Sequence, residues 1–163
     1  MTTPDPSPRF AADAMLGGLA RWLRALGYDT TWEAGIDDDE LVRGAATEGR
    51  LVLTRDAALA ARRAGESMLR VRADAPLDQL REVHARVPLS DRAAFTRCTR
   101  CNEPLTPVSP EQAAVPPAVR AAEKELRRCP SCHRVYWEGS HTARMRDAWT
   151  AALGKENGGT ETL

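Results

Sequence analysis

The chain has no long apolar run, no net charge and little lysine. Each of these deficits excludes or weakens one functional interpretation. No apolar run approaches the ~20 residues that a membrane span requires, so a transmembrane protein is not expected. The 23 basic and 23 acidic side chains cancel, so overall charge gives no reason to expect nucleic-acid binding. Because lysine is scarce, arginine is the ordinary surface base, and a single arginine is weak evidence for a binding site.

The N-terminus also lacks the apolar segment of a signal peptide. Its first residues, MTTPDPSPRF, contain three prolines, and we expect residues 1–8 to be disordered. The tail at 151–163, which includes GKENGGTETL, predicts disorder as well. Without an export signal the expected compartment is the cytoplasm. A length of 163 residues suits one domain, or a small domain with a minidomain.

The cysteines form two Cys-x-x-Cys pairs with 27 residues between them, namely Cys98, Cys101, Cys129 and Cys132. In a cytoplasmic protein this spacing predicts one structural zinc ion held by four thiolates, as in a zinc ribbon. A disulfide pair or a redox motif is the alternative, although neither pair follows a strand-to-helix turn. Asn102 and His133 come directly after the pairs, where such turns often require positive φ.

Before the cysteines, the pattern predicts strands that alternate with helices. The predicted strands lie within 9–13, 28–32, 50–54 and 67–73, and the predicted helices within 14–27, 39–49, 55–65 and 76–87. This order favours an α/β fold with a parallel sheet flanked by helices, which we place at 9–95. We place the zinc ribbon and a final helix at 96–150. Six apolar residues recur at helical spacing, so we predict that they form one face of a helix and pack in the core as an apolar stripe: Met15, Leu16, Leu19, Trp22, Leu23 and Leu26.

An aspartate follows each predicted strand. Asp13 follows the first, the run Asp37–Asp39 follows the second, Asp56 the third and Asp74 the fourth. Since parallel strands end at the same edge of a sheet, these carboxylates are expected to be neighbours. Clustered carboxylates repel one another unless a cation lies between them, and oxygen ligands suit Mg²⁺ or Mn²⁺. The arrangement therefore predicts a metal site able to hydrolyse phosphodiesters.

Helix capping is the competing explanation for each acid. Asp37 with Glu40 fits a capping box, Asp39 fits a solvated first turn, and Asp56 is placed to cap the next helix. Asp13 is harder to explain in this way, because it stands among alanines at a strand end. Taken together, the acids favour the metal site.

Long stretches of the sequence resemble one known family. The segments DAMLGGLARWLRALGYDT, DDDEL, EGRLVLTRD, RCTRCNEPL and RCPSCHRVYWEGSHTARM closely resemble the Mut-seven C-terminal RNase domain family over about residues 9 to 150. The resemblance implies a PIN-like fold, a C-terminal zinc ribbon and Mg²⁺- or Mn²⁺-dependent ribonuclease activity.

The resemblance also implies which acids act. It places catalytic and metal-binding roles at Asp13, Asp38 and Asp56, with Asp37 or Asp39 as alternatives to Asp38. Many PIN nucleases carry a further acid just after the position of Asp56, where this chain has alanine and leucine. The site is then a three-carboxylate one, with Asp74 as a possible fourth ligand, and two-metal catalysis is in doubt.

Candidate RNA contacts come from local charge. Residues 1–96 carry 13 basic against 15 acidic side chains, and residues 97–149 carry 9 against 6. We consider Arg21, Arg55, His141 and Arg144 as possible contacts. His141 could approach the scissile phosphate if the final helix folds over the sheet edge, and otherwise it is a surface residue. Tyr136 and Trp137 either stack on bases or dock the ribbon on its host domain.

Three hypotheses remain open at this stage. The chain is a metal-dependent ribonuclease, an RNA- or ribosome-binding module with a degenerate site, or a zinc-held protein scaffold whose acids act only as caps. The sequence indicates no oligomeric state.

Overall fold

The structure is a computed structural model that describes residues 7–122 and 124–154. The segments expected to be disordered lie outside these residues, except for 7–8 and 151–154. The final helix, α6 (Ser140–Leu153), runs past the expected boundary at 150. Within the described ranges, no helix combines the length and the apolar character needed to cross a membrane.

The main sheet consists of four parallel strands in the order β2-β1-β3-β4. Their bounds are β1 (Phe10–Ala12), β2 (Thr30–Trp32), β3 (Leu51–Thr54) and β4 (Met68–Arg70). The chain passes from β1 to β2 on one side and then returns past β1 to β3 on the other. The predicted α/β fold with a parallel sheet is thus confirmed, and its topological switch lies between β1 and β3.

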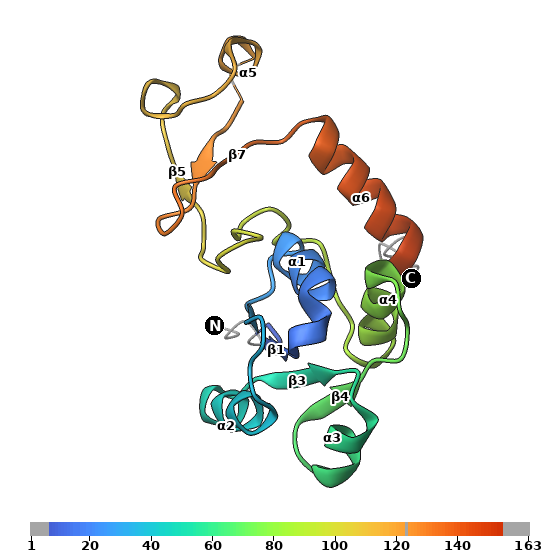
Figure 1. Cartoon of the computed structure of the whole chain (residues 1–163). Helices are drawn as coiled ribbons and strands as arrows, with labels where there is room; N and C mark the ends of the chain where they lie inside the picture. The colour runs from blue at the N-terminus through green and yellow to red at the C-terminus, as the bar shows by residue number, and fades with distance from the viewer. Residues whose placement is uncertain (1–6, 123, 155–163) are drawn as a thin grey trace, which may run out of the picture.

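Helices cover both faces of this sheet (Figure 1). The pair α1 (Gly17–Ala25) and α4 (Pro76–Arg86) lies on one face, and the pair α2 (Asp38–Glu48) and α3 (Ala57–Arg62) lies on the other. Successive β1 residues point to opposite faces, as strand geometry requires. Phe10 and Ala12 join the larger core beneath α1, whereas Ala11 packs with Leu41 and Val52 on the α2 face.

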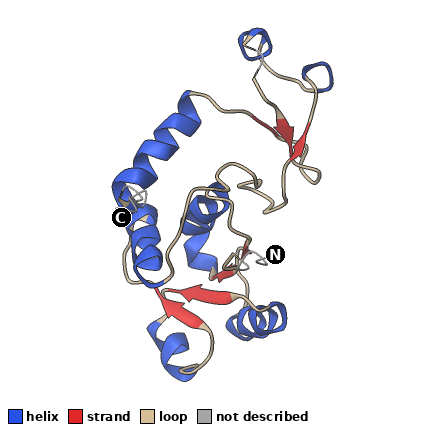
Figure 2. Cartoon of the chain, turned by 180° about the vertical axis from the view of Figure 1, so that it is seen from behind, coloured by secondary structure: helices blue, strands red, loops and turns tan. Residues whose placement is uncertain are grey.

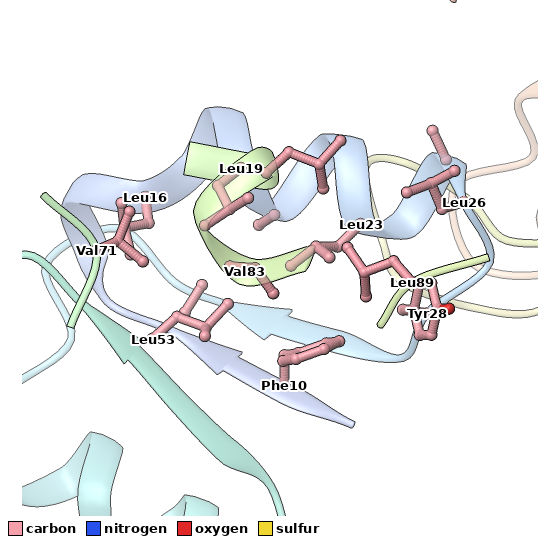
Figure 3. Close-up of a cluster of buried hydrophobic side chains, with 14 of the residues drawn as sticks. Phe10, Leu16, Leu19, Leu23, Leu26, Tyr28, Leu53, Val71, Val83 and Leu89 are labelled. Carbon is pink, nitrogen blue, oxygen red and sulfur yellow. The ribbon is translucent and has the colours of Figure 1, made fainter. Parts of the chain in front are cut away.

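The larger core is built from the predicted apolar stripe, with one exception. Figure 3 shows Leu16, Leu19, Leu23 and Leu26 packed over the sheet. Met15 was wrongly assigned to this core, because its side chain is 69% exposed. The reason is local: Ala14–Leu16 forms a 3₁₀ turn, η1, so Met15 does not follow the angular spacing of the α-helix that begins at Gly17.

Helix ends follow the expected chemistry in most places. Gly49 ends α2 in the left-handed conformation with φ 66°, and Pro76 occupies the first turn of α4. Serine is a favoured cap residue, which made Ser140 the expected cap of the final helix, but the cap is Gly139. The N–H of Gly139 donates to the Thr142 hydroxyl at 2.8 Å.

The cysteine-containing region forms a small antiparallel sheet apart from the main one (Figures 1 and 2). It comprises β5 (Thr106–Pro107), β6 (Arg127–Arg128) and β7 (Val135–Tyr136), with η2 (Pro110–Gln112) and α5 (Pro117–Ala121) in the connection. After β7 the chain enters α6, which packs against α4. Trp149 of α6 is buried in the main core, so the C-terminal helix completes the α/β unit.

Candidate metal centres and nuclease site

Four thiols converge in the small sheet. The sulfur atoms of Cys98, Cys101, Cys129 and Cys132 all lie within 4.8 Å of one another, and none forms a disulfide. The Sγ atoms of Cys98 and Cys132 are 3.8 Å apart. A tetrahedron with metal–sulfur bonds of about 2.3 Å has edges of about 3.8 Å, so the cluster has the dimensions of a four-thiolate zinc site.

Each cysteine pair is shaped by its backbone. The N–H of Cys101 donates to Cys98 Sγ at 3.3 Å, and that of Cys132 donates to Cys129 Sγ at 3.5 Å. The following residues, Asn102 and His133, have φ of 69° and 60°, as predicted. The two turns therefore have matching geometry, and their N–H groups stabilise negative charge on sulfur.

The thiols titrate unequally because they are close together. Burial opposes ionisation of Cys98, but hydrogen bonds from the Tyr136 hydroxyl, at 3.1 Å, and from nearby N–H groups outweigh it and lower its pKa to about 7. Burial and the neighbouring cysteines raise the pKa of Cys101 to about 12. Without a cation the cluster thus resists carrying several thiolates, and a divalent metal removes that penalty.

A polar junction attaches the first cysteine turn to the α/β unit. The guanidinium of Arg24, which is 4% exposed, donates to the carbonyls of Thr30, Thr99 and Arg100 at 2.9, 3.1 and 2.9 Å. Burial lowers the pKa of Arg24.

Asn102 forms the second half of this junction. Its side chain accepts the Thr30 N–H at 2.9 Å and donates to the Asp29 carboxylate at 2.7 Å. Asp29 also pairs with Arg50 at 2.7 Å. Although burial opposes ionisation, these hydrogen bonds hold the pKa of Asp29 well below its usual range. The start of β2 is thus tied to the cysteine turn by side chains that sequence reasoning did not single out.

The other candidate site lies at the carboxyl edge, the edge of the main sheet where β1 to β4 end. Asp13 follows β1, and Arg55 and Asp56 follow β3, so both acids lie at the switch between these strands. Asp13 is only 8% exposed and makes no side-chain bond to the helical turn after it. Capping therefore does not account for Asp13.

Thr54 connects the two acids at this switch. Its buried hydroxyl donates to the Asp13 carboxylate at 2.7 Å and accepts the Asp56 N–H at 3.0 Å. Among the described residues, no cationic side chain pairs with Asp13. Sequence reasoning missed Thr54, although the TRD motif contains it and its place at a strand end was a usable signal.

Two of the other acids cap helices, as the competing explanation predicted. Asp37 Oδ1 accepts the N–H groups of Asp39 and Glu40 at 3.0 and 3.4 Å, at the start of α2. Asp56 Oδ1 accepts those of Ala58 and Leu59 at 2.7 and 3.0 Å, at the start of α3. The Leu59 and Ala58 N–H groups lower the pKa of Asp56, so it is an anion at neutral pH.

The remaining acids are paired with arginines. Asp38 contacts Arg62 at 3.2 Å, and Asp39 contacts Arg63 at 2.5 Å. Across the part of the chain that the structure describes, the four cysteines are the group of three or more potential ligands that converge within 4.8 Å. Asp13 and Asp56 thus directly follow β1 and β3, Asp38 begins the helix after β2, and the three carboxylates do not form a closed ligand shell.

The expected RNA contacts are distributed over different parts of the molecule. Arg21 is exposed on α1, and Arg55 forms an ion pair with Asp74. His141 and Arg144 are exposed on α6. Since α6 packs on α4, the helix does not fold across the carboxyl edge, which was the condition for His141 to reach the phosphate.

Comparison with known proteins gives one match. The chain matches the family model described as Mut7-C RNAse domain over residues 8–149, which is most of its length. Searches of the curated proteins and of the solved structures returned no match. The matched range contains the main sheet, the carboxyl edge and all four cysteines, as the sequence resemblance predicted. This chain therefore belongs to the Mut7-C RNase domain family.

Proposed function

We propose that this protein is a metal-dependent ribonuclease with its active site at the carboxyl edge. The observation that carries the proposal is the environment of Asp13, a carboxylate at the topological switch that is buried, bonded to Thr54 and engaged in no helix cap. A buried carboxylate is costly without a cation, so Asp13 fits a ligand for Mg²⁺ or Mn²⁺. The family match supports RNA as the substrate.

Asp56 fits the same role. Both of its helix N–H bonds go to Oδ1, so Oδ2 can bind a cation without loss of the cap. Thr54 fixes Asp13 relative to the backbone of Asp56. Asp38 remains our third proposed ligand, and it must exchange its contact with Arg62 for the metal.

When bound, the cation would lower the pKa of a water molecule and stabilise charge on the phosphate oxygens. The side chains of Asp13 and Asp56 would hold the cation, and Thr54 would keep Asp13 oriented. Arg62, once released from Asp38, would be available to bind phosphate. We place RNA contacts also at Arg21 and Arg55, with His141 and Arg144 as contacts remote from the reaction.

We assign zinc to the four cysteines as a structural ion. The 3.8 Å sulfur separation and the matched backbone turns support this assignment. We keep the division of the chain into an α/β domain at 9–95 and a segment at 96–150. That segment carries the ribbon and a final helix that packs back on the α/β domain.

One observation favours a second function, an RNA-binding module with a degenerate site. The three carboxylates do not converge, and Asp38 already has a cationic partner. A protein of this kind would bind RNA and leave it intact.

The test is cleavage of labelled single-stranded RNA by zinc-loaded protein, with and without added Mn²⁺. We expect Mn²⁺-dependent cleavage that falls by more than about 100-fold in Asp13→Asn. Asp37→Asn is the matched control, because it removes a nearby helix-capping acid that is not one of the three proposed ligands. Equal cleavage by wild type and Asp13→Asn, or RNA binding without cleavage, would contradict the ribonuclease proposal.

A further inference from the structure

Two large apolar side chains remain exposed in the described part of the chain, and both flank the candidate site. Met15 is 69% exposed and Trp32 is 36% exposed. Met15 lies in the turn directly after Asp13. Trp32 ends β2, where it is the register partner of Ala12, the residue before Asp13. These two side chains therefore both lie close in the fold to the buried carboxylate.

The indole of Trp32 is held in a fixed orientation. Its Nε1–H donates to the Ala14 carbonyl at 3.0 Å, in the same turn that contains Met15. Gly17 packs against the indole ring. A Cβ at this position would lie 2.9 Å from the indole Cζ2 atom. The hydrogen bond to Ala14 and the absence of a side chain at Gly17 allow the indole to pack against the start of α1. Part of the indole ring remains exposed to solvent.

The charges around this ring restrict what it can bind. Glu33 follows Trp32, the acidic start of α2 follows shortly after, and residues 25–42 contain no basic side chain that could bind phosphate. Affinity for RNA at this point must come from an uncharged contact. Base stacking on an aromatic ring is such a contact, and it is worth about tenfold or more in affinity per base.

We propose that Trp32 stacks against one base of a single-stranded RNA and thereby presents the adjoining phosphate to Asp13. Met15 provides apolar contact at the border of the same base. This inference rests on the proposed ribonuclease function and adds a substrate subsite to it.

The test combines a base deletion with a side-chain deletion. Binding of short oligouridylates is measured in the Asp13→Asn background, with one abasic position moved along the strand. We expect one position at which base removal weakens binding by about tenfold, and no further loss at that position in Trp32→Ala. Trp32→Phe should retain most of the effect. Trp137→Ala is the matched control, because it removes an aromatic residue of the ribbon.

Two further measurements test the proposal if the Trp32→Ala variant does not fold. Gly17→Ala keeps every binding side chain but displaces the indole, so it should weaken the same base-dependent binding. In the unsubstituted protein, 5-iodouridine RNA should photocrosslink to Trp32. Base-dependent binding that is unchanged in Gly17→Ala, or crosslinks confined to Trp137, would overturn the stacking proposal.

The outcomes also separate this proposal from the one it rests on. Mn²⁺-dependent cleavage with no Trp32-dependent base effect would overturn the subsite and leave the ribonuclease standing. A Trp32 surface that fails to bind RNA and associates with a protein or a second copy would also overturn the subsite. Loss of all RNA binding and cleavage in folded protein would overturn both.

Discussion

The cysteine cluster and the carboxyl edge hold their potential ligands in opposite ways. The four sulfur atoms already converge, because two backbone turns of matching geometry direct them inward. The carboxylates share one edge, but a hydroxyl, helix N–H groups and an arginine hold them individually. Thiols have few competing partners in a protein, whereas carboxylates have many. The acids would therefore need a cation to draw them together, whereas the cysteines already converge.

Loss of a cysteine should have the largest effect on stability. We expect Cys98→Ser to abolish zinc binding and the folded structure of the ribbon, since structural zinc contributes on the order of 10 kcal/mol to small metal domains. Zinc content by atomic emission and thermal unfolding would measure this. Cys101→Ser should behave alike, and a ribbon that stays folded without metal would contradict the structural role.

Arg24 tests whether the two regions are coupled. Arg24→Met removes three hydrogen bonds and leaves one buried and two partly buried carbonyls without this donor, so we expect a loss of about 2–4 kcal/mol in unfolding free energy. Arg21→Met, at an exposed position on the same helix, is the control. In zinc-free protein the Arg24 effect should shrink, because the cysteine turn is no longer in place. An effect independent of zinc would show that the regions are not coupled.

Asp37 and Asp56 form a matched pair that separates helix capping from metal binding among the acids of the candidate site. Each accepts two helix N–H groups, so replacement of either by alanine should lower stability in chemical denaturation by a similar, small amount. Only Asp56→Ala should also abolish cleavage, because Asp56 is a proposed ligand and Asp37 is not. Equal cleavage activity in the two variants would show that Asp56 acts only as a helix cap.

The smallest expected effect is a pH dependence from Asp29. Its pKa in the folded protein lies below the value of about 3.9 in unfolded chains, so its contribution is fully present above pH ~5. That contribution is lost as pH falls through the folded pKa. We expect about 1 kcal/mol, allowing for solvent screening. Comparing wild type with Asp29→Asn by denaturation at pH 7 and pH 3 measures it, and parallel pH profiles would contradict it.

Much of the fold could be predicted from the sequence because its signals are local. The alternation of strands and helices, the end of a predicted helix at residue 49 and the positive φ at Asn102 all follow from short patterns. The failures were also local in origin. Met15 left the core because a 3₁₀ turn preceded the helix, and the final helix is capped at Gly139 rather than at Ser140.

The candidate site could be predicted less completely, because its partners are distant in sequence. Topology placed Asp13 and Asp56 at one edge, but no pattern indicated that Thr54 would join them. The pairing of Asp38 with Arg62 across two helices, and of Arg24 with the cysteine turn, likewise depends on tertiary packing.

The most direct test of the account is calorimetric titration of zinc-loaded protein with Mn²⁺, for wild type beside Asp13→Asn, with zinc content measured in both. We predict binding in the wild type and its loss in Asp13→Asn, with the zinc content unchanged. Absence of Mn²⁺ binding in a folded, zinc-loaded wild type, or equal binding in Asp13→Asn, would contradict a carboxylate metal site at this edge.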